Sequence, residues 1–88
     1  MDFLKAVKPY ETRMISDLQT LLRFNTELIE TPEDKTAPFG LGIKEALDWL
    51  LSKGKEYGFK TYNVDYVAGH IEFGQGDDII GILCHIDV

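Results

Sequence analysis

The last eleven residues of this chain, D-I-I-G-I-L-C-H-I-D-V at 78–88, constrain its fold more than any other stretch. Within 79–86, His85 is the one residue that is neither apolar nor glycine. The run is too short to cross a membrane, which takes about 20 apolar residues. It is typical instead of a strand that is buried on both faces of a sheet. We therefore expect a strand at 78–87 that carries polar chemistry only at its end, as His85 and Asp87.

The length and the net charge of the chain limit the number of domains and the classes of partner that we expect. With 88 residues the chain forms one domain at most, with a modest core. Its net charge is −6, and its nine Lys and Arg residues are scattered. A nucleic-acid partner is therefore not expected, because phosphate binding needs clustered basic side chains.

The single cysteine and the N-terminal sequence indicate the cellular compartment that we expect for the protein. Cys84 has no second cysteine to pair with, so the chain is not a disulfide-stapled secreted scaffold. The N-terminus, M-D-F-L-K-A-V-K-P-Y-E, lacks the basic and apolar regions of a signal peptide. We expect a cytoplasmic protein without membrane attachment.

Two stretches have the period of an amphipathic helix. The first covers roughly residues 9–25, where Pro9 suits the first turn, and the second covers roughly 42–57. Gly58 then stands where a left-handed C-terminal cap is expected. The apolar positions, spaced as one face of each helix, are Met14, Ile15, Leu18, Leu21 and Leu22, and then Ile43, Ala46, Leu47, Leu50 and Leu51.

The residues between these helices, 25–41, are polar and predict a loop. Pro32 and Pro38 each disfavour helix at the preceding residue. Long ordered loops in compact domains are often functional. The sequence leaves two interpretations open, a mobile surface loop and a contact surface for a part of the protein that is missing here.

After the second helix the pattern changes to the period of two that strands have. Residues 59–66 and 67–73 predict two half-exposed strands, and the short junction at 65–69 predicts a hairpin. The sequence G-Q-G-D at 74–77 is a turn, and the strand at 78–87 follows.

The expected fold class is α/β, with two N-terminal helices followed by three β-strands. A third strand buried on both faces needs helices on both sides of the sheet, and two amphipathic helices cover one face at most. We therefore expect residues 1–88 to be the truncated start of a larger α/β/α domain.

His85 and Asp87 have the chemistry of one metal ligand and the carboxylate that orients it, which is part of a metal site. Residues two apart in a strand project to the same face, and ligands of open α/β sheets bind beyond the ends of the strands. A histidine that binds a metal usually donates its other N–H to a carboxylate or carbonyl, which fixes the tautomer. The pattern is weak by itself, and a histidine held by an aspartate at a strand end, without a metal, explains it more readily.

A zinc site needs three or four protein ligands, and the remaining candidates do not obviously complete one. We interpret His70 as a sheet-surface histidine and Cys84 as a small buried hydrophobe. Cys84 also alternates with His85 along the expected strand, so the two do not easily hold one ion. The other acidic candidates are Asp65, Glu72, Asp77 and Asp78.

Several short segments together make the chain resemble the N-terminal segment of a family of two-zinc peptidases and deacylases. The family includes carnosinases, acetylornithine deacetylase and succinyl-diaminopimelate desuccinylase, and the resemblance is strongest to PepV-type dipeptidases, which cleave Xaa-His or β-alanyl dipeptides. The segments are P-F-G-x-G at 38–42, E-A-L at 45–47, Y-G-F at 57–59, G-H-I-E-F-G at 69–74 and G-I-L-C-H-I-D-V at 81–88.

The resemblance implies a role for each residue of the pair. His85 resembles the first zinc ligand of the family, and Asp87 resembles the active-site acid that orients it. Cys84 departs from the small residue that usually precedes this histidine. In a complete enzyme of this kind, two zincs activate a bridging water that attacks a peptide carbonyl, and a glutamate takes its proton. That glutamate, the other ligands and the lid or dimerisation domain have no counterpart in residues 1–88.

Three hypotheses about function follow. The chain is the amino-terminal fragment of a metal-dependent dipeptidase, inactive alone and without stably bound zinc. Alternatively, it is a non-catalytic binding module that forms a homo-oligomer through its exposed sheet, because an unpaired strand is a template for pairing. The third and weakest hypothesis is a small hydrolase that assembles His85 and Asp87 from two subunits. Whether the chain itself is an enzyme stays open.

Overall fold

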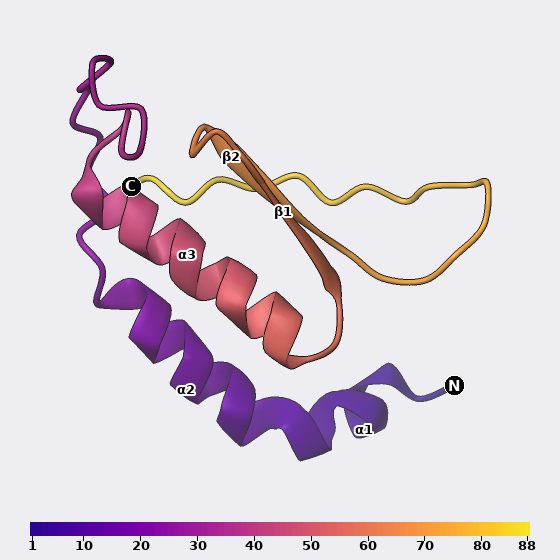
Figure 1. Cartoon of the computed structure of the whole chain (residues 1–88). Coiled ribbons are helices and arrows are strands. Elements are labelled where there is room, and N and C mark those ends of the chain that lie inside the picture. Colours follow the sequence, from indigo (N-terminus) through magenta and orange to yellow (C-terminus); the bar gives the residue numbers. More distant parts are fainter.

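A computed structural model describes all residues 1–88 and has two helical layers and a small sheet (Figure 1). The fold class predicted from the sequence, α/β with helices before strands, is confirmed. None of the helices has the length and apolar character that crossing a bilayer requires. The elements in chain order are α1 (Phe3–Val7), the 3-10 turn η1 (Lys8–Tyr10), α2 (Glu11–Leu22), α3 (Leu41–Glu56), β1 (Lys60–Val64) and β2 (Ala68–Glu72).

The N-terminal helices are short and begin with recognisable signals. The Asp2 side chain accepts a hydrogen bond from the Lys5 amide at 3.1 Å, which caps α1. Pro9 lies in the first turn of η1, where its missing N–H has no cost. The helix predicted at 9–25 is thus divided into η1 and α2.

Helix α3 is close to the prediction at 42–57 and packs against the hairpin. Gly58 has a φ of 86° and ends the helix as expected. A Cβ at Gly69 of β2 would lie 2.8 Å from Leu47 Cδ1, which is too close for a stable contact. The glycine therefore lets α3 approach the sheet at Leu47, one of the few buried residues of the core.

The two strands form an antiparallel hairpin, as predicted. Lys60 pairs with Glu72 at one end of the ladder and Val64 with Ala68 at the other. Residues 65 and 66 both have positive φ, 55° and 57°, as in the turns that match the twist of a hairpin.

The loop predicted at 25–41 is present and folds back on itself. The Ile29 amide donates to the Phe39 carbonyl at 3.0 Å, and the Thr31 amide donates to the Pro38 carbonyl at 2.9 Å. These bonds close the loop at its base and set it at the N-terminal end of α3 (Figure 1).

The third strand expected at 78–87 does not form, which corrects that part of the prediction. Residues 73–88 contain no strand, and Ile80 and Leu83 are 95% and 99% exposed. Their one backbone hydrogen bond outside regular elements joins the Val88 amide to the Thr26 carbonyl at 3.2 Å. An apolar strand gains stability only where both of its faces are covered. Here the segment swings away from the hairpin and returns beside it unpaired (Figure 1).

Candidate functional site

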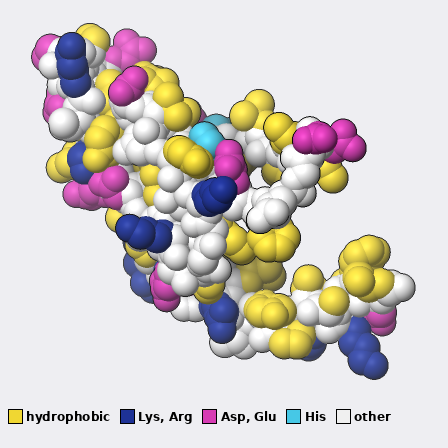
Figure 2. Space-filling view, turned by 45° about the vertical axis from the view of Figure 1, so that its right-hand side comes forward, with side chains coloured by type: hydrophobic (Ala, Val, Ile, Leu, Met, Phe, Trp, Pro, Cys, Tyr) yellow, Lys and Arg dark blue, Asp and Glu magenta, His cyan; other side chains and the backbone are white.

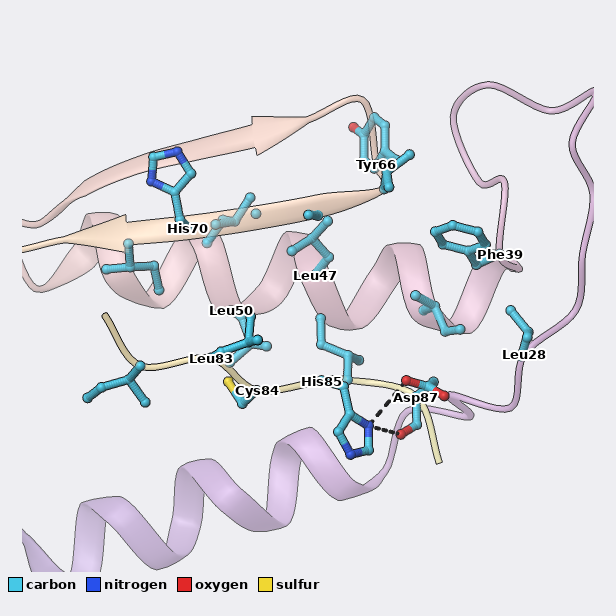
Figure 3. Close-up of a pocket in the computed structure, with 18 residues that line it drawn as sticks. Leu28, Phe39, Leu47, Leu50, Tyr66, His70, Leu83, Cys84, His85 and Asp87 are labelled. Carbon is cyan, nitrogen blue, oxygen red and sulfur yellow. Dashed lines mark hydrogen bonds and ion pairs between the residues drawn. The ribbon is translucent and has the colours of Figure 1, made fainter. Parts of the chain in front are cut away.

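An apolar hollow of about 780 Å³ separates the hairpin and α3 from the returning segment (Figure 3). Leu47 and Leu50 of α3 and Phe39 of the loop line it on one side. Residues 82–87 line the other side and bring His85 and Asp87 to its rim. The predicted polar pair thus lies at the edge of this apolar hollow.

His85 and Asp87 are in direct contact. The Nδ1 atom of His85 lies 2.8 Å from the backbone oxygen of Asp87 and 3.2 Å from its Oδ1 atom (Figure 3). The side chain of His85 is 81% exposed, and that of Asp87 is about half exposed. The contact forms even though the segment is not a strand, because only one residue separates His85 from Asp87 in the sequence.

This geometry selects a tautomer of the imidazole. A backbone carbonyl oxygen only accepts hydrogen bonds, so Nδ1 of His85 carries the proton that it donates to Asp87. In the neutral ring, Nε2 then holds a lone pair and is free to act as a base or as a metal ligand. A histidine that binds a metal through one ring nitrogen usually donates the N–H of the other ring nitrogen to an oxygen.

The donor set fits one part of a metal site. No group of three or more His, Cys, Asp or Glu side chains is placed to hold one ion. A tetrahedral zinc centre needs three or four protein ligands. His85, oriented by Asp87, has the chemistry of one such ligand, and further ligands would have to be added to it.

The other residues considered as ligands lie elsewhere or make other contacts. His70 of β2 stacks on Tyr62 with ring centroids 4.7 Å apart, and its Nδ1 atom is 3.6 Å from Glu72 Oε1. It lines the hollow from the sheet side, which agrees with its interpretation as a sheet-surface histidine. Cys84 is exposed and not the buried hydrophobe that the sequence predicted, because the strand that would bury it is not formed.

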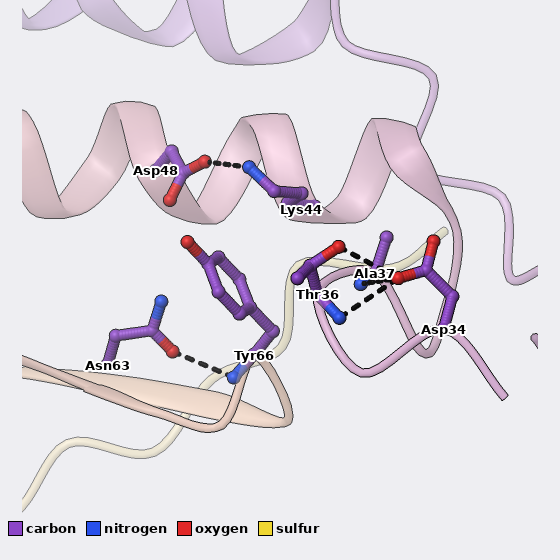
Figure 4. Close-up of polar contacts among 7 residues, drawn as sticks. All are labelled: Asp34, Thr36, Ala37, Lys44, Asp48, Asn63 and Tyr66. Carbon is purple, nitrogen blue, oxygen red and sulfur yellow. Dashed lines mark hydrogen bonds and ion pairs between the residues drawn. The ribbon is translucent and has the colours of Figure 1, made fainter. Parts of the chain in front are cut away.

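A polar cluster that the sequence analysis missed joins α3 to the hairpin turn (Figure 4). Lys44 Nζ lies 2.6 Å from Asp48 Oδ2 and 4.9 Å from the centroid of the Tyr66 ring. The hydrogen bond to Asp48 raises the pKa of Lys44 above its ordinary value. The i, i+4 spacing of Lys44 and Asp48 was a readable signal, whereas the approach of Tyr66 depends on the tertiary fold.

A second set of hydrogen bonds stabilises the loop between α2 and α3, beside that cluster. Asp34 Oδ1 accepts hydrogen bonds from the Thr36 hydroxyl at 2.8 Å, the Thr36 amide at 3.0 Å and the Ala37 amide at 3.2 Å (Figure 4). These bonds stabilise the carboxylate and hold the pKa of Asp34 below its ordinary value.

The chain is similar to proteins whose names describe dipeptidases. It is 46% identical over 82 residues to a Staphylococcus epidermidis protein named "Putative dipeptidase", a match that covers 93% of this chain and 18% of the relative. It is 51% identical over 75 residues to "Putative dipeptidase YtjP" of Bacillus subtilis, which covers 85% of this chain and 16% of that protein. No family model matches the chain.

The similarity links this chain to the dipeptidases named above. The chain spans less than a fifth of the length of these relatives. It therefore corresponds in sequence to one segment of them.

Proposed function

We propose that this chain is the amino-terminal segment of a zinc-dependent dipeptidase of the PepV type, which hydrolyses short Xaa-His peptides. The similarity to the two relatives over 85–93% of the chain supports the link to dipeptidases. The geometry of His85 supports the metal-dependent mechanism, because its Nδ1 atom lies 2.8 Å from the backbone oxygen and 3.2 Å from the carboxylate of Asp87, and its Nε2 atom is left free.

In this proposal His85 is a zinc ligand and Asp87 is its orienting partner. Asp87 accepts the Nδ1 proton, which keeps the lone pair on Nε2 and makes the imidazole a stronger donor. His85 would hold one zinc ion through Nε2, and zinc bound there would supply Lewis-acid activation of water and of the peptide carbonyl. The remaining ligands and the general base belong, in this proposal, to sequence outside residues 1–88.

The proposed location is the cytoplasm. Cys84 is a free and exposed thiol, and such a thiol suits a reducing compartment.

The 88-residue chain alone provides the first test. We expect it to lose zinc on dialysis and to show no turnover of Xaa-His dipeptides, because one histidine ligand does not hold zinc tightly. Retention of one or more zincs per chain together with dipeptide turnover would contradict the proposal.

A chimaera provides the second test. The chain replaces the segment that it matches in the Bacillus subtilis relative, and zinc content and dipeptidase activity are measured. We expect His85→Ala to abolish both, and His70→Ala, the matched control on β2, to leave both unchanged. Equal effects of the two substitutions would remove His85 from the metal site.

A further inference from the structure

The segment at residues 74–88 is held to the rest of the molecule close to its polar pair. All of its residues are exposed except Ile86, which is partly buried and lines the hollow. Its one backbone hydrogen bond joins the Val88 amide to the Thr26 carbonyl at 3.2 Å. Figure 2 shows arms with apolar side chains that project from the body of the molecule. The two anchoring points of the segment therefore lie on either side of Asp87.

The acceptor for Val88 belongs to the start of the loop between α2 and α3, residues 24–27, which we call the connector. Phe24 packs on Trp49 of α3, with ring centroids 6.3 Å apart. The Asn25 carbonyl lies so close to Gly42 of α3 that a Cβ at that glycine would overlap it. Both contacts fix the connector on α3 without any help from the segment that follows the hairpin.

The direction of the Thr26 carbonyl is set within the connector itself. Asn25 Oδ1 accepts a hydrogen bond from the Glu27 amide at 3.2 Å, which closes a turn with Thr26 in its middle. Thr26 is 6% exposed and is the buried polar residue of the chain. Its carbonyl is thus a fixed acceptor for the Val88 amide.

The Val88 amide and the Asp87 carbonyl belong to the same peptide unit. This unit is planar and trans, so its N–H and its C=O point in opposite directions. The N–H donates to the Thr26 carbonyl at 3.2 Å, and the C=O accepts from His85 Nδ1 at 2.8 Å. Hydrogen bonds that are linked in this way polarise one another. The Thr26 carbonyl therefore orients this peptide unit and makes its oxygen a stronger acceptor for the imidazole.

We infer that the connector is a positioning element for His85 and that it acts through the Asp87–Val88 peptide. Thr26 holds the peptide, the peptide oxygen holds the Nδ1 proton, and Nε2 keeps its lone pair for a metal. This inference rests on the proposed function, because it concerns the same zinc ligand. It adds a backbone support for the imidazole to the support that the Asp87 carboxylate gives.

The first test measures the tautomer of His85 in the metal-free 88-residue chain, by nitrogen NMR at a pH where the ring is neutral. Val88→Pro removes the amide donor. The ratio of Nδ1-protonated to Nε2-protonated rings should fall about fivefold, which is the equivalent of one hydrogen bond. An unchanged ratio in this variant would overturn the inference.

The matched control is Ile80→Pro, which places a proline in the same segment. Ile80 is 95% exposed, and its amide donates to no backbone carbonyl. We expect the tautomer ratio of His85 to stay at its parent value. An equal fall in both proline variants would show that any disturbance of the segment moves the ratio, and would contradict a specific role of the Val88 amide.

The second test acts from the connector. Asn25→Ala removes the acceptor that closes the turn around Thr26, and the tautomer ratio should fall about twofold or more. Asn25→Asp keeps an oxygen acceptor and should restore the ratio. Asn25 is exposed, so the circular dichroism spectrum should stay unchanged in both variants. A ratio that Asn25→Ala leaves unchanged, or that both variants lower equally, would overturn the role of the connector.

The chimaera with the Bacillus subtilis relative separates this inference from the proposed function. We expect Asn25→Ala to weaken zinc binding about twofold or more and Asn25→Asp to preserve it. Zinc content that does not depend on His85 would show the proposed function to be wrong, even with a tautomer ratio that responds to Val88→Pro. Zinc content that depends on His85, together with zinc affinity and a tautomer ratio that Asn25→Ala leaves unchanged, would overturn this inference alone.

Discussion

Tyr57 at the end of α3 donates its hydroxyl to Asp17 of α2 at a distance of 3.1 Å, across forty residues of sequence. The same carboxylate lies 3.6 Å from Lys53 Nζ. Burial alone would lower the pKa of Lys53, but the carboxylates of Asp17 and Glu56 outweigh it and raise that pKa. Asp17 is therefore the main polar link between the two long helices.

The first prediction concerns this link. Asp17→Ala removes both contacts and lowers the free energy of unfolding by about 1 kcal/mol. Urea denaturation followed by circular dichroism measures the change. The control is Glu11→Ala, whose partner Lys8 is largely exposed, and its effect stays below about 0.5 kcal/mol. Equal effects of the two changes would show that Asp17 does not join α2 to α3.

The second prediction concerns Gly42 in the first turn of α3. A Cβ at this position would overlap the carbonyl oxygen of Asn25. Alanine favours helix over glycine by about 1 kcal/mol, but the overlap with backbone outweighs this gain. We expect Gly42→Ala to lower the free energy of unfolding by about 1–3 kcal/mol. Gly81→Ala, where a Cβ meets open space, serves as the control and leaves stability unchanged.

These glycines show how far the sequence could predict the fold. Helical and strand periods depend on local spacing, and the two long helices and the hairpin were predicted with bounds close to those observed. The contact between Gly42 and the Asn25 carbonyl depends on how the loop crosses α3, which no local pattern encodes.

The prediction of a strand at 78–87 was wrong for a related reason. Its apolar pattern describes a strand inside a covered sheet, but the environment that would stabilise it is not formed by residues 1–88. The contact between His85 and Asp87 survives because it needs only two residues that are close in sequence. The sequence could predict that pair, whereas the apolar hollow beside it arises from elements far apart in the chain.

The third prediction concerns the hairpin turn. Asp65 has a φ of 55°, a conformation that costs a residue with a side chain about 1 kcal/mol relative to glycine. We expect Asp65→Gly to raise the free energy of unfolding by up to about 1 kcal/mol. Gly58→Ala introduces a side chain at a φ of 86° and should shift the thermal midpoint in the opposite direction. A fall in midpoint for Asp65→Gly would contradict this account of the turn.

The fourth prediction is a pH dependence of the loop. The pKa of Asp34 is lowered in the folded chain, first by the Thr36 hydroxyl and then by backbone amides. Its contribution to stability is therefore present above the ordinary carboxyl pKa and is lost as pH falls through the lowered value. The amide resonances of Thr36 and Ala37 should shift over that acidic range. Asp34→Asn keeps an oxygen acceptor but does not titrate, so the shift should vanish in this variant.

The fifth prediction returns to His85 and Asp87. In the 88-residue chain, nitrogen NMR should find the neutral His85 ring protonated at Nδ1, because that atom donates to oxygens of Asp87. In the chimaera with the Bacillus subtilis relative, Asp87→Ala removes the carboxylate at 3.2 Å and leaves the backbone oxygen at 2.8 Å, so zinc binding should weaken about tenfold, the lower end of the range for loss of a partner behind a metal ligand. Asp87→Asn keeps an oxygen acceptor and should cost less.

The relative effects of Asp87→Ala and Asp87→Asn on zinc binding distinguish an orienting partner of His85 from a zinc ligand. If Asp87 bound zinc directly, Asn would be nearly as harmful as Ala, because an amide replaces a charged carboxylate poorly at a metal. If Asp87 acts through His85, the Asn variant keeps the imidazole tautomer and most of the affinity, and the NMR spectrum of the 88-residue chain reports that tautomer without any metal. A ring protonated at Nε2 in the parent chain would contradict the orienting role directly, since Nε2 would then have no lone pair for a zinc ion.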